Sequence, residues 1–128
     1  MDIPPTYKAI LMIDDEADIQ TVATIGLEMT DGWQVLRASS GKDGVAQAQT
    51  HQPDAILLDI MMPDMDGYAT LEALRADKRT KDIPIIFLTA KARAVDRKKL
   101  YEIGAQGVIH KPFDPTTLGS QIAGFLGW

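Results

Sequence analysis

The chain has 128 residues, of which 45% are hydrophobic and 24% charged, and its 18 acidic and 13 basic side chains give a formal net charge of −5. This length and composition predict one globular domain, and the acidic balance argues against direct nucleic-acid binding, which needs a basic surface. The chain has no cysteine, which excludes a disulfide framework and a thiolate zinc site, and no apolar run near the about 20 residues that span a bilayer, so we expect a cytoplasmic protein without membrane insertion.

Five short runs of apolar or β-branched residues recur along the chain. They cover Ala9–Ile13, Trp33–Ala38, Ala55–Leu58, Ile85–Leu88 and Gly107–Ile109. Segments with helical character lie between them. This alternation is typical of an α/β domain with a parallel sheet that is covered by helices on both faces.

The segments between the runs predict helices. In the first, apolar residues form a stripe with a period of 3.6 residues. These are Ile19, Val22, Ala23, Ile25, Gly26 and Met29. Gly44–Gln49 and Ala69–Ala76 are rich in helix formers, and Leu118–Leu126 carries a last amphipathic face. The charge-dense stretch 75–82 is interpreted as a solvated helix end.

Polar side chains follow four of the five runs. They are Asp14, Asp15 and Glu16, then Asp59, then Thr89, then His110 and Lys111. The carboxyl ends of parallel strands meet at one edge of a sheet, so Asp14, Asp15, Asp59, Thr89 and Lys111 should converge if the first and third strands are neighbours. Any one of these residues alone would be explained by a turn or a helix cap. Together they predict a site, and carboxylate oxygens without His or Cys favour Mg²⁺, or Mn²⁺ in its place.

Four motifs carry a family resemblance. They are ILMIDDE (Ile10–Glu16), DAILLDIMMPDMDG (Asp54–Gly67), IPIIFLTAKA (Ile83–Ala92) and GAQGVIHKPFD (Gly104–Asp114). In this order and at this spacing they resemble the receiver domain of two-component response regulators. The resemblance covers residues 8 to about 126, so we expect 1–128 to be a single receiver domain. It implies a flavodoxin-like, doubly wound fold of five parallel strands in the order 2-1-3-4-5, with five helices.

The resemblance also implies a role for each metal-binding residue. Asp14 and Asp15 would be the acid pair, with Asp15 binding Mg²⁺ directly and Asp14 largely through water. Asp59 would share the ion. Met61 would contribute its backbone carbonyl, which explains why an apolar side chain is tolerated there.

The same resemblance makes Asp59 the phosphoacceptor. Thr89 would hydrogen-bond a phosphoryl oxygen and Lys111 would make a charged contact with it. The bond between Lys111 and Pro112 would be cis, which directs the lysine inward. The donor would be a histidine kinase or a histidine phosphotransfer protein, since His51 and His110 fit surface or packing positions better than a donor role.

Phosphorylation would change a surface made by the fourth helix, fifth strand and fifth helix, where a downstream protein partner would dock. We expect no turnover of a separate substrate beyond the chain's own phosphorylation and dephosphorylation. One departure from the family pattern is Val108, which stands where an aromatic residue is usual. It predicts weaker or differently routed coupling to that surface.

Several alternatives stay open. A haloacid-dehalogenase-like phosphatase also uses a strand-end aspartate with Mg²⁺, but it needs a second acid two residues later, where Met61 stands. A degenerate receiver would be a binding module alone, and an FMN-binding flavodoxin lacks support because the first strand leads into acidic residues rather than a phosphate loop. The chain could be a stand-alone receiver or part of a longer protein. Trp128 could cap the core or make a homodimer or partner contact.

Overall fold

The structure is a computed structural model that describes residues 7–90 and 94–128. Five strands and five helices alternate along it, as the sequence predicts. The strands are β1 (Ala9–Ile13), β2 (Gln34–Ala38), β3 (Ala55–Asp59), β4 (Ile85–Thr89) and β5 (Gly107–His110). The helices are α1 (Ala17–Asp31), α2 (Gly41–His51), α3 (Gly67–Ala76), α4 (Ala94–Glu102) and α5 (Leu118–Leu126). The last two residues of the third motif, Lys91 and Ala92, lie outside the described residues.

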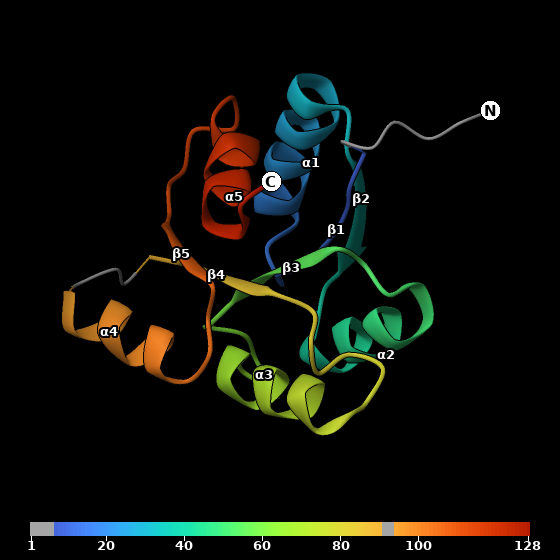
Figure 1. Cartoon of the computed structure of the whole chain (residues 1–128), viewed down its shortest axis with the longest axis vertical. Helices are drawn as coiled ribbons and strands as arrows, with labels where there is room; N and C mark the ends of the chain where they lie inside the picture. The colour runs from blue at the N-terminus through green and yellow to red at the C-terminus, as the bar shows by residue number, and fades with distance from the viewer. Residues whose placement is uncertain (1–6, 91–93) are drawn as a thin grey trace.

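All four strand pairings are parallel, and the sheet order is β2-β1-β3-β4-β5. This confirms the doubly wound topology. Figure 1 shows α1 and α5 together on one face of the sheet and α2, α3 and α4 on the other. Since β1 and β3 are neighbours, the residues that follow them are delivered to the same edge.

The core has two layers, one on each face of the sheet. Along β1, Leu11 and Ile13 pack with the helices α2, α3 and α4, while Ile10 and Met12 pack with α1 and α5. Successive strand residues point to opposite faces. Both faces are covered, so every position of β3 and β4 is buried. This explains why the central strands read as continuous apolar runs.

Helix α1 forms where the apolar stripe predicts a helix, but only part of the stripe, including Ala23 and Gly26, lies on its buried face. Val22, Ile25 and Met29 are exposed by 41%, 51% and 81%. The buried positions are Gln20, Ala23, Thr24, Gly26 and Leu27. Small residues set this face because the chain approaches closely there: a Cβ on Gly26 would lie 2.3 Å from the carbonyl oxygen of Pro115. Among the described helices, none has the length and apolarity needed to cross a membrane.

Candidate functional site

Four carboxylates meet at the carboxyl edge of the sheet. Asp14, Asp15 and Glu16 follow β1, and Asp59 ends β3. Each offers an oxygen, and these oxygens all lie within 4.8 Å of one another. Asp14 and Asp59 are buried, at 0% and 4% exposure, whereas Asp15 and Glu16 face solvent. The strand ends therefore bring together the three aspartates that the sequence singles out.

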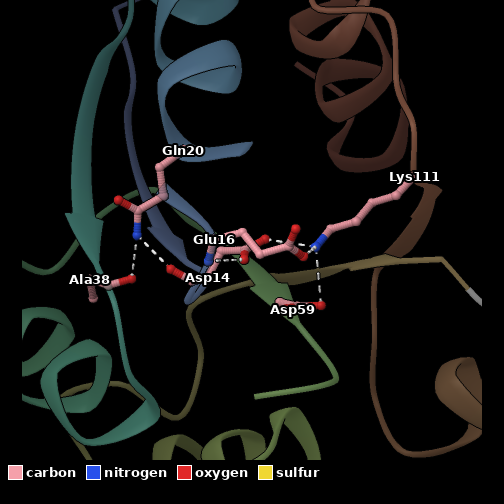
Figure 2. A network of polar contacts seen from close by, with 6 residues as sticks. All are labelled: Asp14, Glu16, Gln20, Ala38, Asp59 and Lys111. Carbon is pink, nitrogen blue, oxygen red and sulfur yellow. Dashed lines mark hydrogen bonds and ion pairs between the residues drawn. The ribbon is translucent and has the colours of Figure 1, made fainter. Parts of the chain in front are cut away.

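Lys111 pairs with three of these four carboxylates. Its Nζ is 2.8 Å from Asp14 Oδ2 and 3.3 Å from both Asp59 Oδ1 and Glu16 Oε1. Figure 2 shows the side chain extending from the end of β5 across to the carboxylates that follow β1 and β3. The Lys111–Pro112 bond is cis, as expected from the sequence. With one ammonium among four carboxylates, the site keeps an excess of negative charge.

This arrangement changes the acidity of its members. Burial, and then the charge of Asp14, raise the pKa of Asp59 to about 6, although Lys111 and the Met61 amide act in the opposite direction. Burial would lower the pKa of the Lys111 ammonium, but its contacts with Asp14, Asp59 and Glu16 raise it overall. The lysine is therefore charged at neutral pH, and Asp59 is mostly a carboxylate.

Thr89 ends β4, the neighbour of β3 in the sheet, and Met61 follows β3 in the chain. Thr89 is 2% exposed, and its carbonyl accepts a 2.8 Å hydrogen bond from the backbone N–H of Lys111. The Met61 backbone N–H donates to the Asp59 carboxylate, and the Met61 side chain is 65% exposed. The role of Thr89 toward a phosphoryl group, and that of the Met61 carbonyl toward a metal, stay predictions.

The loop after Asp59 is held by the start of α3. Asp66 is the N-cap, and its carboxylate accepts a hydrogen bond from Ala69 N at 2.8 Å. Gly67 donates its backbone N–H to Ile60 O at 2.8 Å. A Cβ at Gly67 would lie 2.5 Å from the carbonyl oxygen of Asp59, so a side chain has no room there. The Asp-Gly pair thus positions the backbone that carries Asp59.

Sequence reasoning missed two residues of this network. Glu16 pairs with Lys111, although the sequence pattern singles out only the two aspartates before it as site residues. Its place directly after the acidic pair is a usable signal. Gln20 donates from Nε2 to the carbonyl oxygens of Asp14 and Ala38. No sequence signal marks it, since one of its partners lies 18 residues away.

The donor set fits a divalent cation that prefers oxygen ligands. Asp14, Asp15, Glu16 and Asp59 supply carboxylate oxygens and no nitrogen or sulfur ligand. Asp14 Oδ2 is buried, and its contact is the ion pair with Lys111 Nζ at 2.8 Å. The residues that are present therefore match Mg²⁺ in ligand chemistry and in charge.

Comparison with known proteins decides the family. Residues 10–123 match the family model described as the response regulator receiver domain. The chain belongs to this family. Receiver domains of two-component response regulators are phosphorylation-dependent switches rather than enzymes that turn over a separate substrate, and they typically bind Mg²⁺ at an acidic pocket. The phosphatase alternative is not favoured.

This receiver domain is similar to curated transcriptional regulators and to solved structures of response regulators. It is 39% identical to the DNA-binding dual master transcriptional regulator RpaA of Synechocystis over 91% of this chain and 48% of that protein. It is 39% identical to the phosphate regulon transcriptional regulatory protein PhoB of Pseudomonas aeruginosa over 93% of this chain and 52% of that protein. The chain thus spans about half the length of these curated relatives. Among solved structures, the chemotaxis response regulator CheY4 of Vibrio cholerae is 30% identical, with a TM-score of 0.85, over 94% of this chain and 99% of that one.

Proposed function

We propose that Asp59 accepts a phosphoryl group from a phosphohistidine on a histidine kinase or a histidine phosphotransfer protein, in a reaction that depends on Mg²⁺. The chain would act as one receiver unit over residues 1–128. The observation that supports this most directly is the position of Asp59: a buried carboxylate at the end of β3, 3.3 Å from the Lys111 ammonium and beside three further carboxylates.

The reaction forms one bond and breaks one. An oxygen of Asp59 attacks the phosphorus, the bond between phosphorus and the imidazole nitrogen breaks, and the released imidazole nitrogen takes up a proton. Phosphoryl transfer depends on positioning and charge stabilisation. Asp59 must be ionised to attack, and a pKa of about 6 satisfies this at neutral pH. When bound, Mg²⁺ would offset the charge of the carboxylates and of the phosphoryl oxygens.

Lys111 and Thr89 then receive new partners. The ammonium that pairs with Asp59 would instead contact a phosphoryl oxygen, and the Thr89 hydroxyl would hydrogen-bond another. Thr89 ends β4, which pairs with β5, so the change reaches the face made by α4, β5 and α5. We propose that a downstream protein partner docks there. Hydrolysis of the acyl phosphate, with Asp59 regenerated, returns the switch to its first state.

Val108 bears on this coupling. It lies on β5 opposite Phe87 of β4, is 9% exposed and packs in the core cluster with α3 and α4 residues. A buried valine has no long side chain that could swing between surface and core. We therefore propose, as the sequence predicts, that phosphorylation is coupled to the face of α4, β5 and α5 more weakly or by a different route than in receivers with an aromatic residue at this position.

Acetyl phosphate provides a direct test. We expect the wild type, with acetyl phosphate and Mg²⁺, to gain the mass of one phosphoryl group, and we expect EDTA to prevent this. Asp59→Asn should gain nothing. Asp54→Asn is a matched control because Asp54 precedes the same strand at its opposite end, where its carboxylate accepts from Ala9 N. Retained phosphorylation of Asp59→Asn would contradict the assignment, catalytic release of phosphate without retention would indicate a phosphatase, and no reaction would indicate a binding module.

A further inference from the structure

Gln20 connects three parts of the site's scaffold. It lies in the first turns of α1 and is 6% exposed. Its Nε2 donates to the carbonyl oxygen of Asp14 at 2.6 Å and to that of Ala38, the last residue of β2, at 2.8 Å. Figure 2 shows the side chain reaching from α1 to both strand ends. The two acceptors use both N–H groups of the amide.

These bonds act where the chain leaves the sheet. The β1–β2 ladder ends at the Ile13–Ala38 pair, and Asp14 N then donates to Ala38 O at 3.0 Å. Within three residues the chain turns from β1 into α1. A buried backbone carbonyl needs a partner, and Gln20 supplies the one for Asp14.

The side chain of Asp14 depends on this turn. Its Oδ1 accepts from Glu16 N at 2.9 Å, and its Oδ2 lies 2.8 Å from Lys111 Nζ. The amide of Gln20 fixes the backbone of the same residue from the other side. Asp14 is thereby held at both its main chain and its carboxylate. Asp15 is the next residue, so the position of its backbone depends on the same turn.

We propose that Gln20 is a positioning residue for the cation site, fixing the turn between β1 and α1 so that Asp14 and Asp15 present their carboxylates to the ion. This inference rests on the proposed function and assigns a role to a residue that contacts neither the phosphoryl group nor the ion. Groups that orient metal ligands typically change metal affinity by about 10- to 100-fold when they are replaced. Gln20 would likewise orient a metal ligand, because it holds the backbone carbonyl of Asp14.

The test compares Mg²⁺ dissociation constants, measured by isothermal titration calorimetry on the full chain. Gln20→Met keeps the length and helix propensity of the side chain and removes both donors. Thr80→Val is the matched control. Thr80 is fully buried and makes the same kind of bond, from its hydroxyl to Leu74 O at 2.6 Å, in the loop before β4.

We expect Gln20→Met to raise the Mg²⁺ dissociation constant by about tenfold or more, and Thr80→Val to leave it within about twofold. Saturating Mg²⁺ should restore the rate at which acetyl phosphate phosphorylates Gln20→Met, a recovery that a general loss of packing would not give. If Gln20→Met does not fold, Gln20→Asn replaces it, because an amide one methylene shorter cannot span both carbonyls. Wild-type affinity in the substituted protein, or an equal loss in Thr80→Val, would overturn the proposal.

The two proposals can fail separately. If the wild type is not phosphorylated on Asp59 but Gln20→Met still weakens Mg²⁺ binding, the phosphoacceptor role fails and the positioning role stands. If the wild type is phosphorylated and Gln20→Met binds Mg²⁺ normally, the positioning role alone fails. A wild type that binds no Mg²⁺ would overturn both.

Discussion

The two edges of the sheet are built in opposite ways. At the carboxyl edge, one lysine lies among four carboxylates, and two of these carboxylates are buried. At the amino edge, Trp33 and Trp128 pack edge to face with ring centroids 5.5 Å apart, and Lys8 lies 4.5 Å from the centre of the Trp128 ring. Carboxylates therefore lie close together at the carboxyl edge, whereas the amino edge carries an aromatic contact.

Arg75 strengthens this contrast. Its guanidinium donates to the carbonyl oxygens of Lys81 at 2.6 Å and Ile83 at 2.9 Å, and to Gly104 O at 3.3 Å. These carbonyls lie in the loops that enter β4 and β5. At the amino edge, Arg75 thus supplies donors to loop carbonyls, whereas the carboxyl edge keeps more carboxylates than cationic side chains. The candidate site lies at the carboxyl edge alone, and substitutions at the two edges can show which of them affect Mg²⁺ binding and phosphorylation as well as stability.

The largest effect is expected at Gly67. Its Cβ position lies 2.5 Å from Asp59 O and 2.7 Å from Ile60 Cα, so Gly67→Ala must displace the backbone that carries the phosphoacceptor. We expect a loss of about 3 kcal/mol in the free energy of unfolding, measured by urea denaturation, and strongly reduced phosphorylation. Gly124→Ala in α5 is the control: nothing lies within 4 Å of its Cβ position, and unchanged or higher stability is expected. Equal behaviour of the two variants would show that the close approach of Gly67 to Asp59 does not constrain the loop that carries the phosphoacceptor.

The charge of Asp59 should make the cation-free protein sensitive to pH. Its pKa is raised from 3.8 to about 6 by burial and by Asp14, so the folded protein binds the proton more tightly than the unfolded chain. Stability should therefore fall as pH rises from about 4 to about 6, and the full loss, on the order of 3 kcal/mol, should persist above that range. Asp59→Asn should lack this part of the pH dependence in urea denaturation without Mg²⁺. Parallel pH profiles for the two proteins would contradict it.

Arg75 tests the amino edge. Arg75→Met keeps much of the apolar stem and removes the donors to Lys81 O and Ile83 O. We expect the free energy of unfolding to drop by about 1–2 kcal/mol, since hydrogen bonds to a charged group are lost. The Mg²⁺ dissociation constant should stay within about twofold of the wild type. A large change in Mg²⁺ affinity would show that the two edges are coupled.

The smallest effect is expected at the aromatic contact. Trp128→Ala removes the edge-to-face pair with Trp33 and the Lys8 contact, so stability should fall by about 1 kcal/mol with no change in phosphorylation. The oligomeric states of the wild type and of Trp128→Ala, measured by analytical ultracentrifugation, also test the homodimer contact suggested by the sequence. A wild-type dimer that becomes monomeric in Trp128→Ala would assign Trp128 to an interface in addition to its packing on Trp33.

The sequence predicts the sheet and the acidic cluster because both depend on local patterns. The residue type at each strand end and the parallel strand order together place Asp14, Asp59 and Lys111 at one edge. Local patterns do not predict which face of α1 is exposed. The close approach of Pro115 to Gly26, two residues far apart in the sequence, decides which face of the helix is buried.

Contacts between distant segments were also missed. The charge density of the stretch 75–82 predicts a solvated helix end, yet Arg75 donates to a carbonyl 29 residues away as well as to its own loop. Gln20 is similar, since its partner Ala38 becomes a neighbour only when β2 pairs with β1. Such residues carry no periodic signal, and their roles follow from the tertiary structure.

Mg²⁺ titration of the wild type, Asp15→Asn and Asp59→Asn by calorimetry at neutral pH tests most directly whether the carboxyl edge is a cation site. We expect one Mg²⁺ per wild-type chain, about tenfold or greater weakening in each variant, and wild-type affinity in the remote Asp54→Asn control. Absence of saturable binding in the wild type, or equal affinity in all four proteins, would contradict the assignment of these carboxylates to a metal-dependent phosphoacceptor site.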